Sequence, residues 1–172
     1  MLKTAGIFMI LTAAAALGFG RSYELSLREK ALEEILLMIR WLKGEICSQN
    51  ASLHDAFWGV SVRMTGKYRE FLAKTAETME NSPGIRFAEI YRSCAAEILG
   101  ELPLSDKEWD LFLSLGEKLG YLDLEMQKKQ LEFLEEELRC SVNDLRAEIP
   151  AKKKVYQSLG VLGGILLAIL VW

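Results

Sequence analysis

A lysine triplet at 152–154 is followed by the stretch 155–172, which carries no charged side chain. As a helix, this stretch would span about 27 Å, close to the thickness of the hydrocarbon core of a bilayer. A helix satisfies its own backbone hydrogen bonds in lipid, and lysines are costly to move across a membrane. The sequence therefore predicts a transmembrane helix over 151–172 with the triplet on the cytoplasmic side. The alternative is a buried helix of a soluble domain.

The amino-terminal stretch 1–20 is also apolar and ends at Arg21. Its basic start, apolar centre and alanine run fit either a cleaved signal peptide or a second transmembrane helix. Cleavage would export the middle of the chain, whereas an uncleaved span keeps the flanking basic residues on the same side as the lysine triplet. We favour the uncleaved span. The predicted order is then a transmembrane helix at 1–20, a cytoplasmic helical domain at 21–149 and a transmembrane helix at 151–172.

The middle of the chain has the periodicity of helices throughout. Leucine and isoleucine recur in steps of three and four between 32 and 46 and again between 131 and 149, which indicates two amphipathic helices. Their spacing suits an antiparallel, coiled-coil-like pair. No segment alternates apolar and polar residues between turn signals, so we expect no sheet. The predicted fold is all-α, a helical bundle with long antiparallel helices and a transmembrane helix at each terminus.

Polar residues mark where the shorter helices begin. Ser52 with Asp55 resembles a capping pair, and Ser105 with Glu108 forms an S-x-x-E capping box. The dipeptide at 82–83, Ser-Pro, suits the cap and first position of a further helix. Apolar residues at helical spacing are expected to form the core: Leu32, Ile35, Leu36, Ile39, Phe57, Phe71, Phe87, Ile90, Leu111, Leu115 and Leu122.

The chain offers little for catalysis or metal binding. His54 is the only histidine, and the cysteines Cys47, Cys94 and Cys140 lie far apart without C-x-x-C spacing. No glycine-rich phosphate loop follows a strand, and the net charge of -3 gives no case for nucleic acid. We therefore expect no catalytic residue, no metal site, no cofactor and no nucleic-acid partner.

Gly116 and Gly120 lie four residues apart inside a helical pattern, where each glycine costs about 1 kcal/mol relative to alanine. Two explanations remain open. Either another backbone packs closely against this face, or the helix breaks here and the long stretch from 105 to 149 folds back. On the first explanation, Asp123 and Gln127 continue the same side, which makes the four residues a candidate partner-binding surface.

A second glycine pair, Gly160 and Gly164, lies within the carboxyl-terminal apolar stretch. Its G-x-x-x-G spacing lets two helices approach closely in a membrane. The pair is therefore a candidate site of transmembrane helix packing.

Several segments carry a resemblance to a known family. They are a short amino-terminal span, WLKGEI at 41–46, SLHDA at 52–56, LGEKLGYLDLEMQ at 115–127 and YQSLGVLGG at 156–164. Together they resemble the stage III sporulation protein AB family of endospore-forming bacteria over nearly the whole chain. The resemblance implies a component of the transenvelope channel complex between mother cell and forespore. It also implies helical similarity to the inner-membrane platform proteins of type II secretion, and a place in the mother-cell membrane. The implied partners include a cytoplasmic secretion-type ATPase and other membrane proteins.

We therefore expect a non-catalytic scaffold between a cytoplasmic ATPase and membrane partners, with self-association into a homo-oligomer left open. One alternative is a platform component of another secretion or pilus machine. A generic membrane-anchored adaptor or a membrane-shaping, holin-like protein is another. A third is a membrane-associated enzyme that uses carboxylates such as Asp123 and Glu125.

Overall fold

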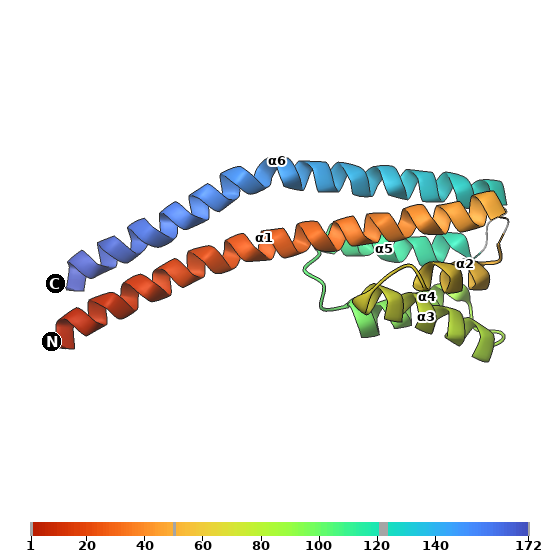
Figure 1. Cartoon of the computed structure of the whole chain (residues 1–172), viewed down its shortest axis with the longest axis horizontal. Coiled ribbons are helices and arrows are strands. Elements are labelled where there is room, and N and C mark those ends of the chain that lie inside the picture. The colour runs from red at the N-terminus through yellow and green to blue at the C-terminus, as the bar shows by residue number, and fades with distance from the viewer. Residues whose placement is uncertain (1, 50, 121–123, 172) are drawn as a thin grey trace. The chain divides into compact units, whose positions relative to one another are not determined.

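The computed structural model describes the backbone of residues 2–49, 51–120 and 124–171. Side chains are described for residues 20, 23–47, 51–120, 125–156, 158 and 162. Within these ranges the fold is all-α, as the periodicity predicts, and no described residue lies in a strand. The helices shown in Figure 1 are α1 (Leu2–Gln49), α2 (Leu53–Ser61), α3 (Gly66–Asn81), α4 (Phe87–Leu99), α5 (Asp106–Leu119) and α6 (Leu124–Val171).

The chain divides into two compact units. The bundle unit comprises residues 31–142, and the terminal unit comprises residues 1–30 with 143–172. Both α1 and α6 contribute to each unit. These divisions differ from the predicted boundaries at 20 and 150, which refer to a membrane and stay a prediction.

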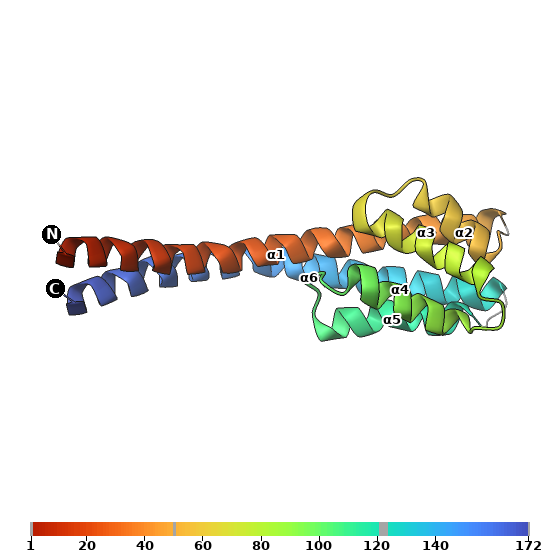
Figure 2. The ribbon, with the colours of Figure 1, turned by 90° about the horizontal axis from the view of Figure 1, so that it is seen from below.

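In the bundle unit, α1 and α6 form the predicted antiparallel pair (Figures 1 and 2). The guanidinium of Arg40 donates to Glu135 at 3.0 Å, and Lys43 donates to the same carboxylate. The predicted apolar stripes of both helices are buried, which confirms the periodicity argument. Their buried members in this unit are Leu32, Ile35, Leu36, Ile39, Leu42, Ile46, Leu131, Leu134, Leu138 and Val142.

In the terminal unit, the first part of α1 lies beside the last part of α6, as both ribbon views show (Figures 1 and 2). Leu145 and Ile149 are buried there, and Arg146 Nε donates to Glu29 Oε1 at 3.0 Å. The helix α6 continues through Pro150, although a proline has no N–H to donate to the preceding turn. The pairing of the two long helices thus belongs to both units.

Two of the predicted helix starts are confirmed in detail. The side chain of Ser52 accepts a hydrogen bond from the Asp55 backbone N–H at 3.1 Å. Ser105 and Glu108 form the reciprocal capping box at the start of α5. Both motifs satisfy backbone donors that the first turn of a helix leaves unpaired.

The predicted helix start at 82–83 is wrong. Helix α4 begins at Phe87, and the Ile85 backbone N–H donates to the Ser82 carbonyl at 3.3 Å, which closes a turn. Gly84 has φ = 103°, a value that favours glycine, and Pro-Gly suits the two central positions of a type II turn. The glycine therefore decides between turn and helix.

The core matches the expected list with few exceptions. Phe87 and Leu111 are only partly buried, and Leu122 lies outside the described residues. Phe112 is fully buried where Leu111 was expected, whereas Leu115 of the same helix is buried as predicted.

No helix is long and apolar enough to cross a membrane among the residues whose side chains are described. The predicted transmembrane helices at 1–20 and 151–172 fall largely on residues outside that set.

Candidate functional site

The centre of the bundle unit is a cluster of aromatic rings around Tyr91 of α4. Its ring lies 5.2 Å from that of Phe71 on α3 and 5.3 Å from that of Phe112 on α5, measured between centroids. Phe57 of α2 and Phe87 of α4 complete the contacts at 6.2 and 5.8 Å. Four short helices therefore meet at one residue.

The Tyr91 hydroxyl is buried and has no hydrogen-bond partner among the described residues. Burial raises the pKa of this phenol well above its ordinary value, because the charged form would lose its water. The hydroxyl therefore stays protonated at physiological pH. The cluster is a packing centre and offers no acid or base.

The glycine pair of α5 packs against this cluster. A Cβ added at Gly116 would lie 2.5 Å from Tyr91 Cδ1, and one added at Gly120 would lie 3.2 Å from Phe87 Cβ. Gly116 is buried, so a partner protein could touch it only by displacing Tyr91. The close approach inferred from the sequence is thus made within the chain, against α4.

The helix also ends at this point, as the second explanation predicts. Helix α5 stops at Leu119 with Gly120 as its cap residue, and α6 starts at Leu124. The stretch from 105 to 149 is therefore not one helix. Gln127 Nε2 donates to the Leu119 carbonyl at 3.0 Å and so satisfies one of the acceptors that the end of α5 exposes.

Three of the four predicted partner-binding residues thus have contacts inside the bundle unit, and Asp123 lies outside the described residues. Partner binding by this surface stays a prediction. Gly160 and Gly164 lie within the backbone of α6, but their packing is also outside the described part of the chain.

Reactive groups do not converge in the part of the chain that the structure describes. It contains no group of three or more histidine, cysteine or acidic side chains placed to hold a metal ion. The cysteines are unpaired, with Cys94 buried and Cys140 exposed. Burial raises the pKa of the Cys47 thiol, which disfavours the reactive thiolate.

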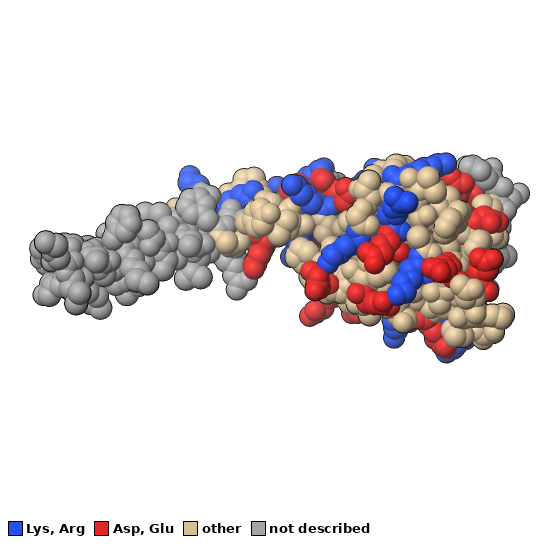
Figure 3. All heavy atoms as spheres, turned by 60° about the horizontal axis from the view of Figure 1, so that its bottom comes forward, with Lys and Arg blue, Asp and Glu red and all other residues tan. Residues whose placement is uncertain are grey.

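Ion pairs cover the outer face of α3, α4 and α5. Figure 3 shows basic and acidic side chains alternating over this face. The pairs with the shortest separations are Lys67–Glu101 at 2.7 Å and Lys74–Glu97, Arg86–Glu89 and Arg92–Glu117 at 2.5 Å. The last two pairs line a groove of about 360 Å³ beside α4, so its charges are neutralised within the chain.

A second groove, which we call the α2–α3 groove, has a volume of about 370 Å³. It is lined by His54, Trp58, Glu77 and Glu80. Unlike the first groove, it is lined by two carboxylates and no lysine or arginine. In the sequence His54 stands out only as the single histidine, and Trp58 does not stand out. The missed signal is the four-residue spacing of His54 and Trp58, which puts both on the outer face of α2 while Phe57 takes the inner face.

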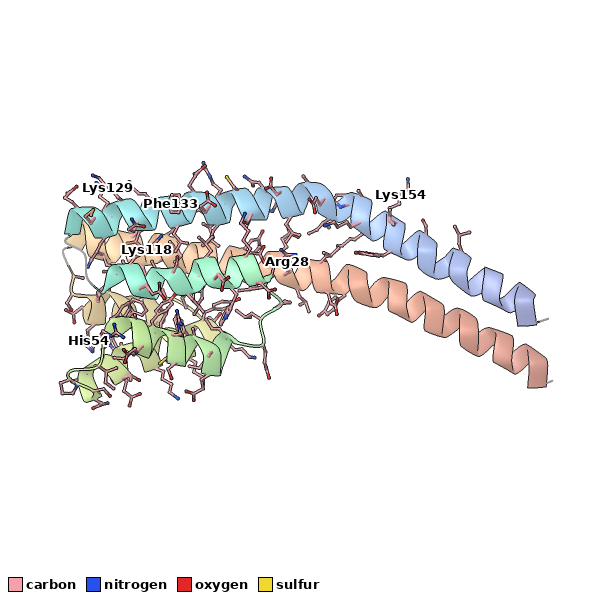
Figure 4. The ribbon with its side chains drawn as sticks, turned by 180° about the vertical axis from the view of Figure 1, so that it is seen from behind. Arg28, His54, Lys118, Lys129, Phe133 and Lys154 are labelled. Carbon is pink, nitrogen blue, oxygen red and sulfur yellow. The ribbon has the colours of Figure 1, made fainter. Side chains whose placement is uncertain are left out.

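The terminal unit carries a basic segment on both of its helices. We define it as Arg28, Lys30, Lys152, Lys153 and Lys154, of which Figure 4 labels Arg28 and Lys154. Lys152 pairs with Glu148, whereas Lys153 and Lys154 have no ion-pair partner among the described residues. Two tyrosines, Tyr23 and Tyr156, are exposed beside it. Basic and tyrosine side chains in this combination are typical of a membrane interface.

Comparisons with known proteins agree with this architecture. The family model described as "Stage III sporulation protein AB (spore_III_AB)" matches residues 3–172. A solved structure of a stage III sporulation protein AB aligns with a TM-score of 0.64 at 16% sequence identity, covering 72% of this chain and 96% of that chain. At this identity the likeness shows a shared fold. No curated protein matches the chain.

Proposed function

The chain belongs to the stage III sporulation protein AB family, and from this premise we propose that it is a non-catalytic, membrane-anchored scaffold of a sporulation channel complex. In this role it holds a cytoplasmic secretion-type ATPase and membrane proteins of the complex together. The ATPase binds on the cytoplasmic side, and the terminal apolar stretches anchor the protein in the mother-cell membrane.

The observation that carries the membrane part of the proposal is the basic segment of the terminal unit. Its lysines directly precede the uncharged stretch 155–172, and Arg28 and Lys30 follow the apolar stretch 1–20. Positive charge beside both apolar ends favours one orientation, with these residues in the cytoplasm near anionic headgroups. This supports a hairpin with both ends of the chain outside and the bundle unit inside.

The arrangement of aromatic and charged side chains in the bundle unit supports the scaffold part of the proposal. The rings of Phe71, Tyr91 and Phe112 meet in the interior, and Lys67 and Lys74 on the outer face pair with glutamates. Neither groove described above is lined by a serine, threonine or cysteine that could serve as a nucleophile beside a base. A compact helical unit with charged side chains on its outer face suits binding.

A topology experiment tests the proposal. A reporter active only in the cytoplasm should work when inserted at the Ser82 turn, and a reporter active only outside should work when fused after Trp172. Replacing the lysine triplet 152–154 with glutamine should weaken this preference. As a control, Lys128→Gln with Lys129→Gln removes two lysine charges from the bundle part of α6 and should leave it unchanged.

The opposite reporter pattern would contradict the hairpin. A mature amino terminus near Leu17 would instead establish a cleaved signal peptide, with the bundle unit outside the cytoplasm.

A further inference from the structure

We propose that the α2–α3 groove receives an arginine or lysine side chain from a protein partner of the complex proposed above. The inference rests on that scaffold function and adds to it a docking point and the chemistry of the group that docks. It is carried by an exposed indole next to two carboxylates in a groove that no lysine or arginine lines.

The indole of Trp58 lies open to solvent because of the way α2 is packed. Phe57 and Val60 take the buried face of this helix, which turns Trp58 outward with 53% of its surface exposed. His54 precedes it by one turn and Val62 follows by one turn, with 71% of Val62 exposed. Figure 4 shows His54 on the side of the bundle unit away from α6. The exposed apolar side chains of Trp58 on α2 and Val62 at its end form a candidate contact surface.

The carboxylates opposite Trp58 differ from three others on the bundle surface. Glu97, Glu101 and Glu117 each pair with a lysine or arginine within 2.7 Å. Glu80, by contrast, meets only the His54 ring, at 3.8 Å, and Glu77 has no ion-pair partner among the described residues. Negative charge is therefore left over at this groove.

A tryptophan face and a pair of carboxylates recognise the same kind of group. The ring attracts a cation above its face, and the carboxylates accept charge-assisted hydrogen bonds from it. Arginine can make both contacts at once, because its planar guanidinium stacks on an aromatic ring and presents several N–H donors at its edge to the carboxylates. Lysine supplies the charge with less directional bonding. We therefore expect arginine to bind more tightly than lysine.

The groove is shallow, since Trp58 keeps half of its surface exposed. Small-molecule sites usually enclose most of their ligand. A side chain presented by another protein needs only an anchoring contact, and tryptophan is enriched among such anchors. These features favour a protein partner over a free metabolite.

The test uses the full chain in detergent micelles and a synthetic helical peptide that carries two arginines four residues apart. The indole N–H signal of Trp58, assigned by its loss in Trp58→Phe, should shift and saturate as this peptide is added. A lysine peptide should bind more weakly, and a glutamine peptide should leave the signal in place. Glu77→Gln with Glu80→Gln should weaken binding of the arginine peptide about tenfold or more. The control pair Asp110→Asn with Glu132→Gln makes the same change in net charge and should bind like the original chain.

The proposal would be overturned by an unmoved Trp58 signal, by equal binding of the glutamine peptide, or by equal weakening in the groove and control pairs. A Trp58 signal that shifts with protein concentration before any peptide is added would overturn it too, because the occupant would then be a second copy of the chain. The peptide test needs no assembled complex. Its failure is therefore distinct from failure of the topology experiment, which tests the membrane-anchored scaffold itself.

Discussion

Among the glycines of the bundle unit, Gly116 comes closest to another side chain, that of Tyr91. A methyl group at Gly116 would overlap the Tyr91 ring, whereas a methyl group at Gly44 of α1 would meet nothing within 4 Å. We predict that Gly116→Ala lowers the free energy of unfolding by about 1–3 kcal/mol through overpacking. Gly44→Ala, at an exposed helical position, should raise it by about 1 kcal/mol. Urea denaturation followed by circular dichroism measures both, and equal effects would contradict internal packing at Gly116.

The unpaired hydroxyl of Tyr91 leads to a second prediction. Removing a buried hydroxyl that has no hydrogen bond relieves a desolvation cost, so Tyr91→Phe should leave the free energy of unfolding unchanged or raise it by about 1 kcal/mol. Tyr68 is the matched control, because its hydroxyl donates to the Ala31 carbonyl at 3.4 Å. Tyr68→Phe should cost up to about 1 kcal/mol. A larger loss in Tyr91→Phe than in Tyr68→Phe would show that the Tyr91 hydroxyl is bonded after all.

At the scale of elements, the pairing of α1 with α6 contains a pH-sensitive contact at Glu135. Partial burial acts to raise the pKa of this carboxyl, but hydrogen bonds from Lys43 and Arg40 outweigh it and hold the pKa below its ordinary value of 4.5. The stabilisation is therefore fully present above about pH 4.5 and is lost as the pH falls through the lower pKa of the folded state.

We predict that Glu135→Gln lowers the free energy of unfolding by about 0.5–1 kcal/mol at pH 7, the range expected for partly exposed ion pairs. The difference from the original chain should shrink to nothing in strong acid, where Glu135 is protonated. Denaturation curves at a series of pH values measure it. Glu132→Gln on the same helix is the control, since Glu132 is exposed, and it should show a smaller effect. If the free energies of unfolding of Glu135→Gln and the original chain differ by the same amount at all pH values, the change in side-chain shape, and not the charge, explains the lower stability.

The helices were predictable from sequence wherever one period dominated. The apolar stripe from Leu32 to Ile46 is regular. It was predicted to be buried, and the structure shows it buried. On α5 the apolar stripe is shorter. Leu111 and Phe112 are adjacent apolar residues, and the helical period alone does not show which of the two is buried. Contacts with Phe71 and Tyr91 decide in favour of Phe112. Helix starts were predictable where a reciprocal cap exists. The prediction of a helix start at 82–83 failed because Ser-Pro suits a turn as well as a helix start.

The surfaces were less predictable than the helices. Gly116 and Gly120 were recognised as positions of close approach, but their neighbours Tyr91 and Phe87 come from α4 and are brought there by the fold. The period of α2 indicates that Trp58 faces outward, but it does not show what lies beside it. Glu77 and Glu80 belong to α3, and only the fold brings them next to the exposed indole.

At the scale of the whole molecule, the chain consists of a helical bundle unit and a terminal unit with basic residues beside apolar ends. Membership of the stage III sporulation protein AB family covers both units, since the family model matches residues 3–172. The proposed scaffold needs both of them, one to bind partners and one to hold the protein at the membrane.

Recovery of partners from sporulating host cells decides between a scaffold and a protein that acts alone. The tagged full chain would be isolated from solubilised membranes after mild cross-linking, and the recovered proteins would be quantified by mass spectrometry against an unrelated tagged membrane protein. We predict that a secretion-type ATPase and other membrane proteins are enriched with the chain and not with the control. If the intact chain is recovered from the membrane without any such ATPase, the scaffold function proposed for it is wrong.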